Sequence, residues 1–136
     1  MHDKNLQVVE AFIVARSAEE RLALYAEDAV FNLPFSHSLI SRDSRWEGRS
    51  ELEKLEAARS RLFPDWEFFN TKYHRTQNPR VIFVRTMGRG HYAPSGAPGR
   101  LLETYYYLQF TVDEGKITRL QQFQNPYAIA NMLGVH

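Results

Sequence analysis

The sequence predicts an α+β fold: a cone-shaped barrel in which helices cover one face of a curved, mostly antiparallel sheet. Apolar residues recur with helical spacing near the N-terminus and again over residues 52–62. Four segments rich in strand-forming residues then follow one another between residues 65 and 124. Such an order places the helices together on one side of the sheet. The 136 residues contain no repeat or linker, so we expect one domain over residues 1–136.

The first 27 residues predict two helices. Leu6, Val9, Phe12 and Ile13 recur at spacings of three and four, which indicates an amphipathic helix over residues 6–16. Ser17 is a typical N-cap, and glutamates in the following turn favour the positive end of a helix dipole. A second helix is therefore expected over residues 18–27.

A strand, a loop and a third helix come next. Residues 28–35 alternate and carry β-branched and aromatic side chains, which predicts a strand, whereas the polar residues 36–50 predict a loop. Ser50 and Glu53 have the spacing of a capping box that begins a third helix. Pro64 stands where this helix must end.

The second half of the chain predicts four antiparallel strands and a short C-terminal helix. The strands are expected at residues 65–76, 80–92, 100–112 and 116–124. If "DEG" before Lys116 makes a type I turn with a bulge, Val112 faces Lys116 and Tyr106 faces Gln122. Asn125 is expected to cap a final helix over residues 126–133.

Composition excludes several classes of function. The net charge is +1, and basic residues are interleaved with acidic ones, so we expect no nucleic-acid partner. The absence of cysteine excludes disulfides and thiolate zinc sites, and no pair of histidines has metal-site spacing. The N-terminal residues resemble neither a signal peptide nor a membrane span. We therefore expect a cytoplasmic protein without a metal, a cofactor or a membrane partner.

A bent sheet with helices across its concave face makes an open cone, a natural pocket for a small ligand. The predicted strand pairing places Tyr106, Leu120, Gln122 and Gln124 on the face that lines it. The Tyr106 phenol and the Gln122 amide could orient a carbonyl or carboxylate and stabilise developing negative charge. The alternative is that Tyr106 packs in the core with its hydroxyl bonded to Gln122.

Three further residues are candidates for the pocket. Arg59 projects from the third helix and either points into the cone to bind an acidic group or lies on the surface with Glu56 or Asp65. His37 belongs to a loop expected at the mouth, where it is either a general base or solvated. Trp66 is expected to form part of the pocket wall.

The opposite strand face carries a group of aromatic and charged residues, which a sheet-to-sheet homodimer explains better than exposure to solvent. Its members are Glu103, Tyr105, Tyr107, Arg119 and Phe123. The strand over residues 80–92 remains ambiguous, because either the face of Gly88 and Gly90 or the face of Arg89 and His91 could line the pocket.

Short stretches over residues 47–125 resemble a known family. They are "EGR" at 47–49, "FPDWE" at 63–67, "TQNP" at 76–79, "GRG" at 88–90, "EGKI" at 114–117 and "F-Q-N" at 123–125. The element order resembles the nuclear transport factor 2-like (SnoaL-like, ketosteroid-isomerase-like) cone. Within that fold the stretches resemble the PhzA/PhzB family of phenazine biosynthesis proteins.

This resemblance implies a small dimeric protein that condenses two unstable cyclic amino-ketone acids by acid/base chemistry inside the cone. The histidine, serine and glutamate that it implies fall at Leu55, Arg59 and Gln122. The aspartate base of ketosteroid isomerase would fall at Leu33. Two hypotheses follow. The first is an enzyme that acts on a small cyclic metabolite with a carbonyl or carboxylate group, by proton transfer, isomerisation, cyclisation or condensation. The second is a non-catalytic dimer that binds such a ligand. The missing proton carriers favour the second, and the remaining tyrosines and histidines keep the first open.

Overall fold

The computed structural model describes residues 2–34 and 45–124. The helices are α1 (His2–Val14), α2 (Ala18–Leu22) and α4 (Arg49–Leu62). The strands are β1 (Tyr25–Asn32), β2 (Arg45–Glu47), β3 (Glu67–Arg75), β4 (Val81–His91), β5 (Leu101–Asp113) and β6 (Lys116–Gln124). In the described residues these strands form one six-stranded sheet in the order β2-β1-β6-β5-β4-β3.

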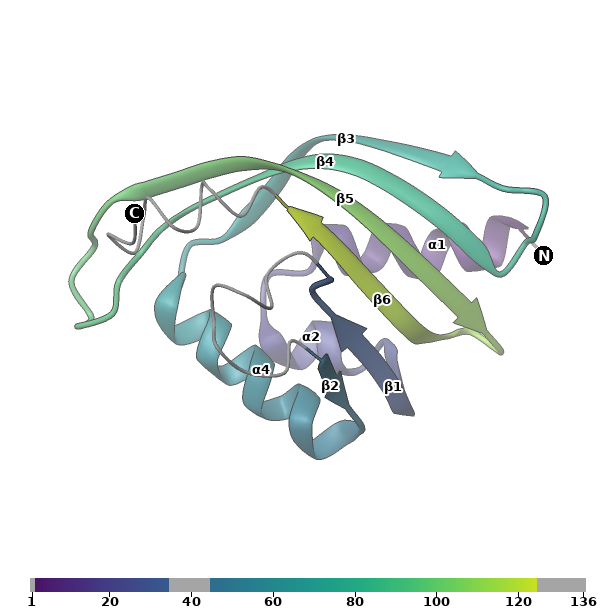
Figure 1. Ribbon diagram of the computed structural model, residues 1–136, viewed down its shortest axis with the longest axis horizontal. Coiled ribbons are helices and arrows are strands. Elements are labelled where there is room, and N and C mark those ends of the chain that lie inside the picture. Colours follow the sequence, from purple (N-terminus) through teal and green to yellow (C-terminus); the bar gives the residue numbers. More distant parts are fainter. Residues whose placement is uncertain (1, 35–44, 125–136) are drawn as a thin grey trace.

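The sheet is curved, with helices on its concave side, and this confirms the predicted α+β cone. Figure 1 shows β3, β4 and β5 arching over α1, while α2 and α4 lie near β1 and β2. Strands β3 to β6 pair antiparallel in sequence, as predicted, whereas β1 runs parallel to β6. No helix within residues 2–34 and 45–124 has the length and apolar character needed to cross a membrane.

The core lies between α1, α4, β1 and the concave face of β4, β5 and β6. Its most buried members are Val9, Phe12, Tyr25, Phe31, Leu52, Ile82, Val84, Leu108, Phe110, Val112, Ile117 and Leu120. Because alternate residues of a strand face opposite sides, the same strands present a second, outer face. On β4, Gly88 and Gly90 are buried and face the cone, whereas Arg89 is exposed on the outer face.

The predicted second helix is too long. It ends at Leu22, and β1 begins at Tyr25, within the range expected to be helical. Tyr25 pairs with Ile117 of β6 and packs edge-on against Phe12, with their ring centroids 5.7 Å apart. Burial of this large ring in the core decides the local conformation over helix propensity.

The predicted loop over residues 36–50 contains a short strand, and the capping box is wrong. Trp46 of β2 packs on Phe31 of β1, with ring centroids 5.8 Å apart. Helix α4 begins at Arg49, and Gly48 is its N-cap with φ of 86°, a backbone conformation that favours glycine. Instead of a capping serine, a carboxylate oxygen of Glu51 accepts a hydrogen bond from the Glu47 amide at 2.6 Å.

The β5–β6 hairpin has the predicted faces beyond its bulge but a different register, and Val112 pairs with Ile117 instead of the predicted Lys116. Glu114 and Gly115 both have positive φ, which makes a two-residue turn, and the bulge lies further along the strands. Leu108 therefore faces Gln122, and Tyr106 faces Gln124, so the predicted pairing of Tyr106 with Gln122 is wrong by two residues. Because the shift is an even number, both side chains still face the cone. The helix predicted over residues 126–133 lies outside the described residues.

Candidate functional site

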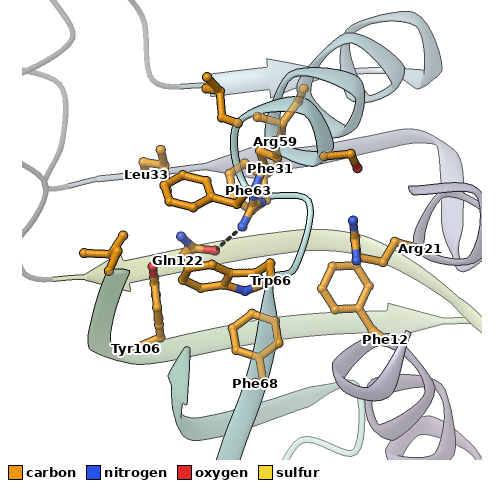
Figure 2. Close-up of a pocket in the computed structure, with 14 residues that line it drawn as sticks. Phe12, Arg21, Phe31, Leu33, Arg59, Phe63, Trp66, Phe68, Tyr106 and Gln122 are labelled. Carbon is orange, nitrogen blue, oxygen red and sulfur yellow. Dashed lines mark hydrogen bonds between the residues drawn. The ribbon is translucent and has the colours of Figure 1, made fainter. Parts of the chain in front are cut away.

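A cavity of about 170 Å³ lies inside the cone, between the helices and the concave sheet face (Figure 2). Its apolar lining residues are Phe12, Phe31, Leu33, Leu55, Leu62, Phe63, Trp66, Phe68, Leu102 and Tyr106. The polar ones are Arg21, Arg59, Ser60 and Gln122. Residues far apart in sequence thus meet here, because α1, α2, α4, β1, β3, β5 and β6 each contribute to the lining.

Trp66 is the centre of an aromatic cluster at one side of the cavity. Its ring centroid lies 5.7 Å from that of Tyr106 and 5.9 Å from that of Phe68, both nearly perpendicular. The indole packs directly on Gly88 and Gly90 of β4, where a Cβ atom at Gly90 would lie 2.8 Å from the ring. Glycine at these two positions lets the tryptophan lie flat on the sheet. Trp66 thus lines the cavity, and its expected role in ligand binding stays a prediction.

Arg59 points from α4 into the cavity (Figure 2). A guanidinium nitrogen donates to the side-chain oxygen of Gln122 at 3.4 Å, and the guanidinium carbon lies 5.3 Å from the centre of the Phe31 ring. Among the described residues, no carboxylate pairs with Arg59. The surface alternative is thereby excluded, because Glu56 pairs with Arg21 and Asp65 with His91.

Arg21 reaches the same cavity from α2 but has a carboxylate partner. Its Nε atom donates to Glu56 at 2.7 Å, and the Glu56 side chain is only 1% exposed. Sequence analysis did not identify this pair. The available signal was the position of Glu56, which follows Leu52 by four residues and therefore falls in the apolar stripe of α4.

Tyr106 presents a protonated phenol at the cavity. Its side chain is 3% exposed, and burial raises the pKa of its hydroxyl well above the ordinary value of 10.0, although the charge of Arg59 opposes the shift. A phenol that does not ionise near neutral pH remains a hydrogen-bond donor.

The structure brings together five of the predicted site residues: Leu55, Arg59, Trp66, Tyr106 and Gln122. Three others are not part of this group. Leu120 is buried in the core and does not line the cavity. Only the backbone of Gln124 is described, opposite Tyr106. His37 lies outside the described residues.

The cavity lining has donors but few groups that exchange protons near neutral pH. In the described part of the chain, no aspartate, glutamate or histidine lines it. Likewise, residues 2–34 and 45–124 contain no cluster of three histidine, aspartate or glutamate side chains suited to a metal ion. The arrangement can bind an oxygen-rich ligand and polarise its oxygen atoms.

The residues predicted for a dimer lie on the outer face of β5 and β6. Tyr105 and Tyr107 are 61% and 54% exposed, although Tyr106 between them is buried. Glu103 and Arg119 are exposed as well, and Phe123 is partly exposed. Glu67 of β3 forms an ion pair with Arg89 of β4, and Asp65, just before β3, is hydrogen-bonded to the His91 ring.

Comparison with known proteins gives a consistent result. A family model described as "Phenazine biosynthesis protein A/B" matches residues 1–136. Phenazine biosynthesis protein PhzA1 of Pseudomonas aeruginosa is 29% identical over 136 residues, which cover 96% of this chain and 81% of that protein.

Solved structures agree with these sequence matches. The crystal structure of a phenazine biosynthesis-related protein (phzb2) from Pseudomonas aeruginosa has a TM-score of 0.88 at 25% identity and covers 99% of this chain and 88% of that one. A putative SnoaL-like polyketide cyclase from Jannaschia sp. has a TM-score of 0.72 at 15% identity, covering 95% and 90%. These similarities confirm the predicted SnoaL-like fold.

Proposed function

Because this chain belongs to the phenazine biosynthesis protein A/B family, we propose that its pocket captures a small cyclic metabolite that carries a carboxylate or a carbonyl group. The observation that carries this proposal is Arg59, a guanidinium that faces an aromatic cavity without a carboxylate partner among the described residues. A cation that is partly removed from water gains most from a ligand that brings the opposite charge.

The chemistry of Arg59 matches a carboxylate in particular. A guanidinium presents a planar fork of donors that fits both oxygens of a carboxylate. The hydrogen bond to Gln122 is long, at 3.4 Å, so a carboxylate would be a stronger acceptor than this amide. We therefore assign Arg59 as the anchor of the ligand's acidic group.

The aromatic walls suit the ring of such a metabolite. Trp66, Phe68 and Tyr106 form a cluster of mutually perpendicular rings against which a flat ligand can pack. The indole N–H of Trp66 is buried and has no acceptor among the described residues. Because this nitrogen is buried, a ligand would contact the aromatic rings of the cluster and not this N–H.

Turnover of the ligand is a second candidate function. Tyr106 and Gln122 would orient a ligand carbonyl, and the phenol of Tyr106 would donate to the oxygen as negative charge develops. The persistence of this buried phenol in its protonated form favours the idea. His37 remains the proposed base, and capture without turnover remains the alternative, because Leu55 and Gln122 replace the residues that the family resemblance implies.

We also propose that two copies associate through the outer sheet face. Tyr105 and Tyr107 project from β5 with more than half of their surface exposed, beside the partly exposed Phe123. Aromatic residues with a charged rim are typical of protein interfaces. Light scattering at micromolar concentration should give twice the mass of one chain, and a Tyr107→Glu substitution should give the mass of one. Separately, we propose that the protein is located in the cytoplasm.

A pair of probe ligands tests the proposed function. Benzoate and benzamide have nearly the same shape, but only benzoate carries a negative charge. In an NMR titration, benzoate should bind about tenfold more tightly than benzamide, a difference of about 1.4 kcal/mol. Its binding should shift the indole N–H signal of Trp66 and leave that of Trp46, which does not line the cavity, unchanged. Equal affinity for the two probes would contradict an anion-binding pocket.

A further inference from the structure

We propose that Phe31 is a positioning residue of the pocket, whose ring holds the Arg59 guanidinium towards the ligand and away from Glu56. The inference rests on the proposed function, since it names the residue that keeps the charge of Arg59 available to an acid. The role differs from that of Arg59, because Phe31 carries no charge and acts on the direction of the guanidinium.

The first step concerns the partner that Arg59 does not take. Glu56 precedes Arg59 by three residues on α4, a spacing at which helical side chains of opposite charge can pair. The Oε1 atom of Glu56 accepts from Arg21, but its Oε2 atom is buried and has no hydrogen-bond partner among the described residues. A carboxylate oxygen is therefore available to Arg59 on its own helix. Pairing with it would draw the guanidinium away from a ligand.

The second step concerns what Arg59 contacts instead. Its guanidinium carbon lies over the Phe31 ring, 5.3 Å from the ring centre, which is within the range of an attractive cation–π contact. The other contact is the hydrogen bond to Gln122, which is longer than usual at 3.4 Å (Figure 2). A long hydrogen bond to a neutral amide holds a flexible arginine weakly. The ring of Phe31 therefore contributes most to the direction of the guanidinium.

The third step is the rigidity of the Phe31 ring. Strand β1 lies between β2 and β6, where Phe31 pairs with Trp46 on one side and Leu120 on the other. The Phe31 side chain is 1% exposed, and the Trp46 ring packs on it with centroids 5.8 Å apart. A ring fixed in this way can order a flexible side chain that packs on it. An arginine ordered before the ligand arrives loses less conformational entropy on binding.

Loss of the ring should release Arg59. With leucine at position 31, the guanidinium loses its aromatic contact and samples other directions, including that of the Glu56 Oε2 atom. The pocket keeps its charge but loses the ordered direction, so a charged ligand gains less over a neutral one of the same shape. A purely structural role of Phe31 would instead lower the affinities for both ligands by the same factor.

Benzoate and benzamide test this inference by NMR titration against the full chain and its Phe31→Leu variant. The preference for benzoate should fall from about tenfold in the unsubstituted protein to about threefold or less in the variant. Phe12→Leu is the matched control, because Phe12 is also a buried phenylalanine that lines the cavity, but its ring packs on Tyr25 and Phe110. It should leave the preference at about tenfold, whatever it does to the two separate affinities.

A second readout follows Arg59 itself in the ligand-free protein. Its side-chain Nε–H signal is assigned by its absence from the spectrum of Arg59→Met. The heteronuclear NOE of this signal reports how ordered the side chain is on the nanosecond timescale. The NOE should fall in Phe31→Leu and stay unchanged in Phe12→Leu.

The outcomes separate this inference from the proposed function. If Phe31→Leu keeps the tenfold preference or an equally ordered Arg59, or if both leucine variants lose the preference by the same factor, the positioning role is overturned and the anion-binding function stands. If the unsubstituted protein shows no preference for benzoate, the proposed function fails and the inference with it. Should Phe31→Leu not fold, Phe31→Met also removes the aromatic ring and should lower the preference; an unchanged preference would overturn the inference.

Discussion

Two arginines line the same pocket and differ in what surrounds their charges. Arg21, at the α2 end, is paired with Glu56 at 2.7 Å, and the two side chains are 16% and 1% exposed. Arg59, at the end near β6, contacts an amide oxygen and an aromatic ring, with no carboxylate beside it in the described residues. Arg21 is neutralised within the protein, whereas the charge of Arg59 is available to a ligand.

From this difference we expect Arg21 and Glu56 to act on the stability of the fold and Arg59 to act on ligand binding. A buried ion pair costs desolvation on both sides, and losing one partner leaves the other charge buried alone. Glu56 is therefore a structural residue, although it lies one position from Leu55, where the family resemblance implies a histidine. Arg59 has no comparable internal partner to lose, so substituting it should affect ligand affinity more than folding.

Removing the carboxylate of Glu56, the partner of Arg21, should have the largest effect on stability. Glu56→Leu leaves the Arg21 guanidinium in the interior without its partner, so we expect the free energy of unfolding to fall by about 3 to 5 kcal/mol. Urea denaturation followed by circular dichroism measures this change.

The control for this prediction removes both charges. The double variant Arg21→Met with Glu56→Leu replaces the pair by apolar side chains, and it should be more stable than Glu56→Leu alone. If the double variant is less stable than Glu56→Leu, Arg21 contributes to folding in another way and the contrast between the two arginines is wrong.

An intermediate effect on stability is expected from a substitution at Gly88, which lies under the Trp66 ring. A Cβ atom at Gly88 would meet the Trp66 ring and lie 2.8 Å from Tyr106. Gly88→Ala should therefore destabilise the fold by about 1 to 3 kcal/mol, and it should weaken ligand binding by moving the indole. Arg85→Ala, on the exposed outer face of the same strand, should change stability by less than about 0.5 kcal/mol. Equal stability of Gly88→Ala and the unsubstituted protein would show that Trp66 does not lie as described.

The smallest effect is expected from a hydrogen-bonded pair outside the pocket, Asp65 and His91. The Asp65 carboxylate accepts hydrogen bonds from the His91 ring at 2.6 Å and from its amide at 2.8 Å. The ring hydrogen bond, followed by the amide one, lowers the pKa of Asp65 below its ordinary value of 3.8. The ionised carboxylate is thus favoured in the folded state, and its contribution is present above that value and lost as the pH falls below it.

Asp65→Asn measures this contribution as a function of pH. The variant should be slightly less stable than the unsubstituted protein at neutral pH, because exposed pairs contribute little. The difference should shrink as the pH falls below 3.8. A difference that grows on acidification would contradict the assignment.

The sequence predicted the cone, the antiparallel strands and, beyond the bulge near the turn, the faces of β5 and β6, because strand residues alternate between two faces. It could not predict the hairpin register, since positive φ at Glu114 depends on a turn type that the letters "DEG" do not determine. Tyr25 lies in β1 and not in a helix, because its ring is buried against Phe12 of α1. The local sequence does not predict this contact between two elements.

The candidate site was predicted in part for similar reasons. The positions of Tyr106 and Gln122 on the concave face follow from strand parity, and both residues line the cavity. The direction of Arg59 depends on how α4 is rotated against the sheet, which the sequence left open. The buried position of Glu56 was marked by its place in the apolar stripe, but a glutamate three residues before an arginine also suggests a surface pair.

The central claim, that Arg59 gives the pocket its affinity for anions, is tested most directly by the preference for benzoate over benzamide in an Arg59→Met variant. Methionine keeps an apolar, unbranched stem like that of arginine but lacks the charged guanidinium. The account predicts that a preference of about tenfold in the unsubstituted protein falls to about one in the variant. A variant that still prefers benzoate by the same factor would show that another group, such as Arg21, recognises the charge, and would contradict the account.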